Sequence, residues 1–196
     1  MPTATDDLET LETILLESPA IALVLEFLSV RREAEYWVGA GAIAQTVWNS
    51  LTGRMPEYCL HDIDVTYFDA EEGDRLSEEV RELELQSALQ PLAVPLDVKN
   101  QALVHQWYQQ KFGYPIKPYS NLVDAVQTWP TTATAVAVRL NQDTGRLEVI
   151  APFGLNDMLS LRVRPNKRQI TKEIYYKYVL RWSRSWPELR FERWEP

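Results

Sequence analysis

The segment that decides the fold reads Leu60-His61-Asp62-Ile63-Asp64-Val65-Thr66-Tyr67-Phe68. Its apolar composition predicts a strand over 62–68, in which successive side chains point to opposite faces. Asp62 and Asp64 then share one face, while Ile63 and Val65 point into the core. Two carboxylates this close repel each other, and a cation relieves the repulsion. Mg²⁺ is the natural candidate because it prefers hard oxygen ligands and commonly takes one or two carboxylates plus substrate phosphates. The segment therefore predicts a metal site and, with it, a bound nucleotide.

A second motif lies upstream, where a short apolar strand expected near 36–38 leads through Gly39-Ala40-Gly41 into a helical pattern. Gly39 and Gly41 let backbone amides approach an anion closely, and the positive end of the following helix adds attraction. We therefore take Gly39, Ala40 and Gly41 as candidate phosphate-binding residues. The same residues also fit a tight strand-to-helix turn that binds nothing, and Asp62 and Asp64 also fit two surface acids on an edge strand.

A glycine turn at a helix start, followed by an Asp-x-Asp strand, resembles the nucleotidyltransferase superfamily typified by DNA polymerase beta. The long interval from Gly39 to Asp62, with Leu51-Thr52-Gly53 ending the intervening helix, looks more like the tRNA CCA-adding enzymes. The resemblance implies an α+β fold, with a mixed central sheet flanked by helices, and a third acid on a later strand. Asp97 matches that acid and lies in a strand expected near 95–99.

Nearly the whole chain is similar to a family of bacterial nucleotidyltransferase-like proteins that is poorly characterised in function. The likeness is carried by four stretches: Gly39-Ala40-Gly41 with Val47-Trp48, His61 to Asp69, Val98-Lys99-Asn100-Gln101-Ala102, and Trp129 to Val136 through Val149 to Leu155. The resemblance implies that Asp62, Asp64 and Asp97 are catalytic and bind Mg²⁺ or Mn²⁺. It also implies transfer of a nucleoside monophosphate from ATP or another nucleoside triphosphate to a small molecule, protein or RNA.

Several candidate residues have a second interpretation. Asp97 also fits a solvated strand residue. Lys99 is placed to steer phosphate from the same strand face, yet it also fits a lysine that is solvated or paired with Asp97. Asn100 is a candidate nucleotide contact or a cap for the helix that follows.

The chain also departs from the family pattern. Ala40 replaces the usual second glycine or serine of the turn, and Ala44, Gln45 and Asn49 replace an arginine, an asparagine and an acid. These departures favour an alternative in which the protein is a nucleotide-binding regulator without turnover.

Length and composition fit a single domain over 1–196, and the resemblance implies that it is nucleotidyltransferase-like, with a core at about 20–110 and a C-terminal hairpin and helices at about 120–196. A length of 196 residues and 45% hydrophobic content suffice for a sizeable core. The single cysteine, Cys59, cannot form an internal disulfide, and no signal peptide is recognised, so a cytoplasmic setting is expected. The longest apolar run, 20–28, contains Glu26 and is too short to cross a membrane, so no membrane partner is expected.

Charge is unevenly distributed along the chain. The net charge is −8, but residues 161–196 hold ten Lys or Arg against four Glu. Aromatic residues alternate with these basic ones, which favours a nucleic-acid-binding module as a third interpretation. The plainer alternative is a helix whose aromatic side chains cover the core while its charges are solvated.

Helices are expected from Asp6 or Asp7, after Ser18-Pro19, over 74–89, 101–111, 122–128 and 154–161, and as a long basic helix after 164–166. The charged helix over 74–89 is expected to keep one face in water. The clearest hairpin pairs 134–140 with 146–150 around a turn at 141–145, and we expect its strands to extend the central sheet.

Overall fold

The computed structural model describes residues 4–74, 76–90 and 92–195. At its centre is a five-stranded sheet with the strand order β3-β2-β1-β4-β5. β2 and β3 run parallel, and the other neighbouring pairs are antiparallel, which confirms the predicted α+β class with a mixed sheet. The strands are β1 (Trp37–Gly39), β2 (Ile63–Tyr67), β3 (Leu96–Asn100), β4 (Ala137–Leu140) and β5 (Leu147–Ile150).

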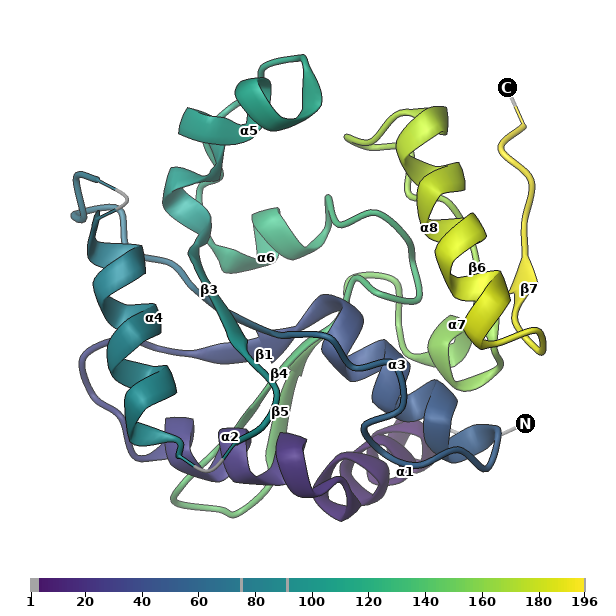
Figure 1. Ribbon diagram of the computed structural model, residues 1–196, viewed down its shortest axis with the longest axis horizontal. Helices are drawn as coiled ribbons and strands as arrows, with labels where there is room; N and C mark the ends of the chain where they lie inside the picture. The colour runs from purple at the N-terminus through teal and green to yellow at the C-terminus, as the bar shows by residue number, and fades with distance from the viewer. Residues whose placement is uncertain (1–3, 75, 91, 196) are drawn as a thin grey trace.

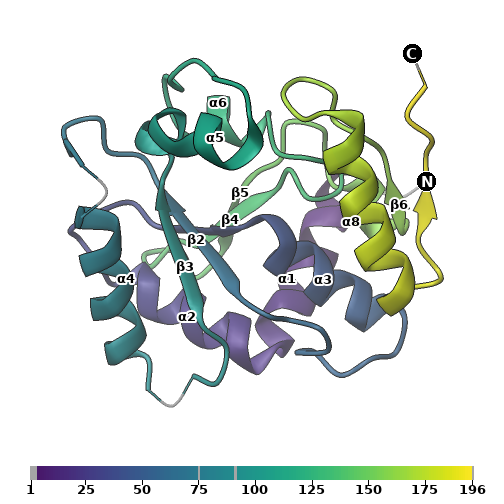
Figure 2. The same ribbon diagram turned by 45° about the horizontal axis from the view of Figure 1, so that its top comes forward.

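Helices cover both faces of this sheet (Figures 1 and 2). On one side lie α1 (Ala4–Glu17) and α2 (Pro19–Ser29), and on the other α5 (Val104–Phe112) and α6 (Leu122–Val126). α4 (Leu76–Ala88) stands beside the edge strand β3. The remaining elements are α3 (Ala40–Leu51), the 3-10 turn η1 (Gln101–Leu103), α7 (Asn156–Leu159), β6 (Arg162–Val163), α8 (Lys172–Ser185) and β7 (Arg190–Phe191). Within the described residues, no helix combines the length and apolar character that crossing a membrane requires.

Strand alternation divides the apolar side chains into two buried clusters. Val38, Val65 and Val98 face the larger cluster, which α1, α2 and α3 complete. Trp37 and Ala137 point to the opposite face and pack under α6. On that same opposite face, the residues nearer β3 are polar. The apolar contacts therefore fix the sheet from one side and leave part of the other side for a site.

The elements expected from the sequence are present with small shifts at their ends. The predicted hairpin forms β4 and β5, and β4 pairs with β1, so the hairpin extends the central sheet as predicted. Ser18 is the N-cap of α2 with a proline at the helix start, although its hydroxyl makes no capping bond.

The edge strand β3 is covered by acceptor side chains from one face of α4. Gln86 Oε1 accepts a hydrogen bond from the Leu96 amide at 2.7 Å, and Glu82 Oε2 accepts one from the Val98 amide at 3.0 Å. Glu78 Oε1 accepts the third, from the Asn100 amide, at 2.9 Å. Four helical residues rise about 6 Å and two strand residues about 6.6 Å, so the two repeats match. The helix thereby satisfies amides that an edge strand otherwise leaves open.

Replacing Glu78 with Ala should destabilise the protein by about 1–3 kcal/mol, because the Asn100 amide would lose its partner in a buried setting. Glu78 itself is 2% exposed, so water cannot readily replace the lost acceptor. Glu78→Gln keeps an acceptor oxygen and should stay closer to the wild type. Urea unfolding measures both variants, and equal losses for Ala and Gln would contradict this role.

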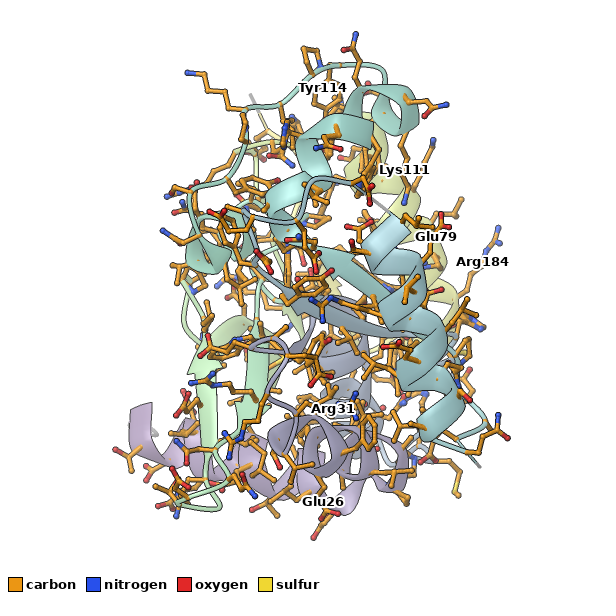
Figure 3. All side chains as sticks on the ribbon, turned by 90° about the vertical axis from the view of Figure 1, so that its left-hand side faces the viewer. Glu26, Arg31, Glu79, Lys111, Tyr114 and Arg184 are labelled. Carbon is orange, nitrogen blue, oxygen red and sulfur yellow. The ribbon has the colours of Figure 1, made fainter. Side chains whose placement is uncertain are left out.

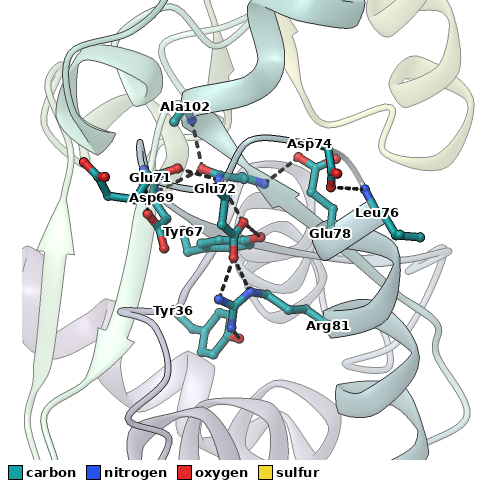
Figure 4. Close-up of polar contacts among 11 residues, drawn as sticks. Tyr36, Tyr67, Asp69, Glu71, Glu72, Asp74, Leu76, Glu78, Arg81 and Ala102 are labelled. Atoms are coloured by element: carbon teal, nitrogen blue, oxygen red, sulfur yellow. Dashed lines mark hydrogen bonds and ion pairs between the residues drawn. The ribbon is translucent and has the colours of Figure 1, made fainter.

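Asn100 anchors the junction between β3 and η1 through hydrogen bonds with Asp69, Glu72 and Ala102, three residues labelled in Figure 4. Its Oδ1 accepts from the amides of Asp69 and Ala102, each at 3.0 Å. Its Nδ2 donates to the Asp69 carbonyl at 2.8 Å and to Glu72 Oε2 at 3.0 Å. Glu72 in turn accepts from Arg81 and from the Tyr67 hydroxyl. The side chain of Asn100 is thus fully used by the fold, as the helix-capping interpretation predicts.

Trp182 of α8, and Trp186 immediately after it, pack against Trp48 of α3. Trp48 makes edge contacts with Trp182 and Trp186, with ring centroids 5.3 Å and 5.5 Å apart. The Trp186 indole donates to Asn49 Oδ1 at 2.8 Å, and Asn49 Nδ2 donates to the carbonyls of Pro56 and Tyr58. These rings are buried, so the interpretation in which the aromatic residues cover the core is the one that the structure supports.

Candidate active site

Three predicted site residues lie in one row across the sheet. Asp64 on β2 is paired with Gly39 on β1 and with Asp97 on β3. Paired residues point to the same face of a sheet, so the two carboxyl groups share the face opposite the larger apolar cluster. Asp62 comes two residues before Asp64, immediately ahead of β2, and is exposed. The fold therefore brings the glycine turn and the three predicted acids together.

The surroundings of Asp64 favour its neutral form. Burial raises the pKa of this carboxyl from its ordinary 3.8 to about 7, with further increases from the charges of Asp62 and Asp97. A hydrogen bond from the Gly41 backbone and the charge of Arg181 lower the pKa but do not offset this rise. Burial and two neighbouring acids thus oppose ionisation of Asp64, and such perturbed groups concentrate at functional sites.

The glycine turn is shaped by close contacts on two sides. A Cβ on Gly39 would lie 2.6 Å from Cη2 of Trp129 and 3.2 Å from the carbonyl oxygen of Val136. A Cβ on Gly41 would lie 3.7 Å from Asp64 Oδ2 and 2.8 Å from Nε2 of Gln45. Gly39 caps α3 in an extended conformation, and the helix starts directly beside Asp64. The first-turn amides of α3 therefore face the acid cluster.

Ala40 occupies the left-handed region, with φ of +52°. A residue with a Cβ pays roughly 1–2 kcal/mol for this conformation, whereas glycine adopts it freely. Ala40→Gly should therefore stabilise the protein by up to about 1 kcal/mol in urea unfolding, after the extra chain entropy of glycine is subtracted.

Ala42 provides the matched control because it lies in the same helix without a positive φ. Ala42→Gly should lower the stability by about 1 kcal/mol. An Ala40→Gly protein that is less stable than the wild type would show that the left-handed conformation of Ala40 does not cost the fold stability.

Lys99 is paired with the third acid. Its Nζ lies 2.5 Å from Asp97 Oδ1 and 3.6 Å from Glu82 Oε2 of α4. Burial alone would lower the pKa of Lys99, but the hydrogen bond to Asp97 and the charges of both acids raise it overall. Of the interpretations open from the sequence, the Asp-paired lysine is the one that the structure shows.

Two residues of α8 complete the surroundings of the acids, and neither was singled out as a site residue from the sequence. The charges of Asp64 and Asp62 add to the effect of burial in raising the pKa of Tyr178, against a lowering by Arg181. The Arg181 guanidinium carbon lies 5.3 Å from the centre of the Tyr178 ring. The alternation of basic and aromatic residues was the available signal, but it could not indicate which of them faces the acids.

The sequence profile of a nucleotidyltransferase family matches residues 33–191, most of the chain. The chain belongs to this nucleotidyltransferase family. The match includes the glycine turn and all three acids. None of the curated proteins matches the sequence.

Solved structures share the fold of this nucleotidyltransferase chain. One, determined by NMR and described as revealing a CCA-adding enzyme head domain, is 26% identical, with a TM-score of 0.76 over 93% of this chain and 94% of that one. A CCA-adding enzyme in complex with CTP is 16% identical, with a TM-score of 0.53 over 93% of this chain and 43% of that one. A CCA-adding enzyme in complex with ATP is 15% identical, with a TM-score of 0.50 over 93% of this chain and 42% of that one. The chain thus spans less than half the length of these two enzymes, and their likeness concerns the fold.

The family resemblance implies a divalent cation, and the donors near Asp64 fit one in chemical type. They are carboxylate oxygens, which Mg²⁺ and Mn²⁺ prefer. The raised pKa of Asp64 comes mainly from burial, with the charges of Asp62 and Asp97 adding to it, and a bound cation would favour the ionised form. As the side chains lie, the described residues include no group of three His, Cys, Asp or Glu that could hold a metal ion. The Asp97 carboxylate is held by Lys99, and it would have to leave that lysine to become a third ligand.

Asn100 is separated from this nucleotidyltransferase site. Alternation along β3 places it on the opposite face from Asp97 and Lys99, where it is fully buried. The site that remains consists of Asp62, Asp64 and Asp97, the turn at 39–41, Lys99, and Arg181 with Tyr178 from α8.

Proposed function

We propose that the chain transfers a nucleoside monophosphate from a nucleoside triphosphate to an acceptor hydroxyl, with Mg²⁺ or Mn²⁺ held by Asp62, Asp64 and Asp97. The observation that carries the proposal is the row in which Asp64 lies between Gly39 and Asp97. A phosphate-binding turn and two acids on adjacent strands are the groups that the reaction needs. Membership of a nucleotidyltransferase family supports it.

In the proposed reaction, the acceptor oxygen forms a bond to the α-phosphorus of the triphosphate. The bond from that phosphorus to the α,β-bridging oxygen breaks, and pyrophosphate leaves with the electron pair. The acceptor hydroxyl loses its proton, for which Asp97 is the proposed acceptor. The cation, when bound, neutralises charge on the attacking and leaving oxygens. The protein otherwise contributes positioning and electrostatic stabilisation rather than covalent chemistry.

Residues of the chain can balance the remaining phosphate charge. The first-turn amides of α3 and the positive end of its dipole attract an anion beside Asp64. Arg181 adds a positive charge from the α8 side, since its charge already acts on Asp64. The triphosphate would therefore lie between the start of α3 and α8.

Pyrophosphate release from ATP, CTP, GTP and UTP, with Mg²⁺ and a cell extract as the source of acceptor, tests the proposal. We expect release with at least one nucleotide and its loss in Asp62→Asn. Asp143→Asn is the matched control, because Asp143 is an exposed acid in the β4–β5 turn. Mg²⁺-dependent nucleotide binding without any pyrophosphate release would favour the regulator and overturn the transferase.

A further inference from the structure

A small cavity lies beside Lys99, the residue that contacts the third acid. It has a volume of about 220 Å³ and is lined by Lys99 of β3 and by Trp107, Gln110 and Lys111 of α5. Lys99 contacts Asp97, so this cavity and the acid cluster share one wall. Figure 3 shows α5, with Lys111 labelled, beyond the first turn of α4, where Glu79 is labelled.

The chemistry of the lining suits a flat ring that carries an anionic group. The Lys111 amine lies over the Trp107 ring, 5.2 Å from its centre, and the second amine, that of Lys99, is paired with Asp97 and Glu82. An indole face stacks on a nucleobase regardless of its identity, and amines bind phosphate. The described residues that line the cavity include no acid, and Gln110 adds a polar group able to donate or accept a hydrogen bond.

The size of the cavity limits what it can hold. Pockets that enclose a whole small molecule are usually about 300–1,000 Å³. The cavity of about 220 Å³ lies below this range and is open to solvent, so it encloses one ring or one sugar phosphate of a ligand that extends outside it. The triphosphate of the donor nucleotide is proposed to lie elsewhere, between the glycine turn and α8.

The order of the site residues across the sheet indicates on which side of Asp64 each substrate would bind. The sheet order places β1 with Gly39 on one side of Asp64 and β3 with Asp97 on the other. In an in-line displacement, the attacking hydroxyl and the leaving pyrophosphate lie on opposite sides of the α-phosphorus. A triphosphate held at the β1 side thus puts the acceptor at the β3 side, where the cavity opens.

We propose that the cavity lined by Lys99, Trp107, Gln110 and Lys111 binds the acceptor, and that the acceptor is a nucleotide. The ring would take the place of the Lys111 amine on the Trp107 face, and the displaced amine would pair with the phosphate, while Lys99 stays with its acids and forms the wall of the cavity. The role of the bound ligand as the acceptor rests on the proposed function, whereas binding of a ligand in the cavity does not depend on turnover. A free nucleotide and the end of an RNA strand present the same chemistry here.

Calorimetric titration with AMP in EDTA tests the cavity without the metal-dependent donor site. We expect AMP to bind the wild type, and Trp107→Leu to weaken binding about tenfold or more, which is the scale of losing one stacked base. Trp107→Phe keeps a ring and should recover most of the affinity. Lys111→Gln should weaken binding several-fold and reduce its salt dependence, whereas Lys117→Gln, an exposed lysine beyond α5, should leave it unchanged. Thermal unfolding checks that each variant is folded.

A parallel titration with a short single-stranded RNA separates the two sources. Tighter binding of RNA than of AMP, with a steep salt dependence, supports an RNA end, and binding of AMP alone supports a free nucleotide. Absence of binding by both ligands, or equal affinity in the wild type and in folded Trp107→Leu, overturns the cavity as a nucleotide site. Binding here without pyrophosphate release from any triphosphate would contradict the proposed function alone.

Discussion

Asp64→Asn is expected to abolish nucleotidyl transfer while making the metal-free protein more stable. In the wild type, burial and the charges of Asp62 and Asp97 oppose ionisation of this carboxyl. The amide of Asn is neutral and nearly the same size, so it removes the repulsion without leaving a cavity. The same change removes a proposed metal ligand, so turnover should fall roughly 100-fold or more, the scale found when a group that stabilises transition-state charge is lost.

The gain in stability should depend on pH in a defined direction. The carboxyl pKa is about 7 in the folded protein against an ordinary 3.8. Below the lower value, both the folded and the unfolded states are protonated, so Asp64 costs nothing. As the pH rises from about 4 to 7, the unfolded state loses its proton first, and the wild type becomes progressively less stable. The advantage of Asp64→Asn should therefore grow over this window and stay constant above it.

Thermal unfolding in EDTA near pH 5 and near pH 8 measures this difference. At the higher pH, we expect the free energy of unfolding of Asp64→Asn to exceed that of the wild type by about 2 kcal/mol, or roughly 4–8 °C in Tm for a protein of this size. The difference should be clearly less at the lower pH. Added Mg²⁺ should raise the Tm of the wild type more than that of the variant. Asp62→Asn is the matched control, because Asp62 is exposed and should lose activity with little gain in stability. An Asp64→Asn protein that is less stable than the wild type near pH 8 would contradict the electrostatic account.

The parts of this fold that sequence predicts are those with local patterns. The alternation from Ile63 to Tyr67 and the turn after Leu140 each specify a strand or hairpin from neighbouring residues alone. The proximity of Asp97 to Asp64 came from a family resemblance, and the parallel register of β2 and β3 now shows it directly.

Contacts between distant segments could not be predicted in this way. The charges of α4 predicted one face in water, and Glu79, Leu83 and Glu84 are exposed, but no local pattern indicated that Glu78 is buried and accepts from an amide of β3. Arg181 is near enough for its charge to lower the pKa of Asp64 because α8 packs on Trp48, and no local pattern encodes that packing. A charged side chain is read from sequence as solvated unless its partner is known.

Trp129 shows the same limit at the glycine turn. From sequence, Trp129 stood only within a stretch that carries the family likeness, just after a helix expected over 122–128, and it was not among the candidate site residues. In the structure, the ring lies against Gly39, so the absence of a side chain there is a packing requirement as well as a possible means of binding phosphate.

Gly39→Ala should therefore be strongly damaging, and Gly41→Ala should not be. The new methyl at position 39 would lie 2.6 Å from Trp129 and 3.2 Å from a backbone oxygen, so the ring or strand β1 must move. Such overpacking costs about 1–3 kcal/mol. Since Gly39 is paired with Asp64, the movement should also displace the acids, and a misplacement of about 1 Å can cost roughly 100-fold in rate. At position 41, the closest atom is the mobile end of Gln45, and alanine favours the helix by up to about 1 kcal/mol.

A double-mutant cycle separates the contact with Trp129 from a general intolerance of alanine at position 39. Urea unfolding would be measured for the wild type, Gly39→Ala, Trp129→Leu and the double variant. Leucine lacks the outer ring atoms that the methyl would meet, so Gly39→Ala should cost much less stability in the Trp129→Leu background. A remaining cost is expected, because the Val136 carbonyl oxygen is still 3.2 Å from the new methyl. Residues in direct contact show coupling energies of about 0.5–3 kcal/mol. The same loss in both backgrounds would mean that the backbone, rather than Trp129, excludes a side chain from this turn.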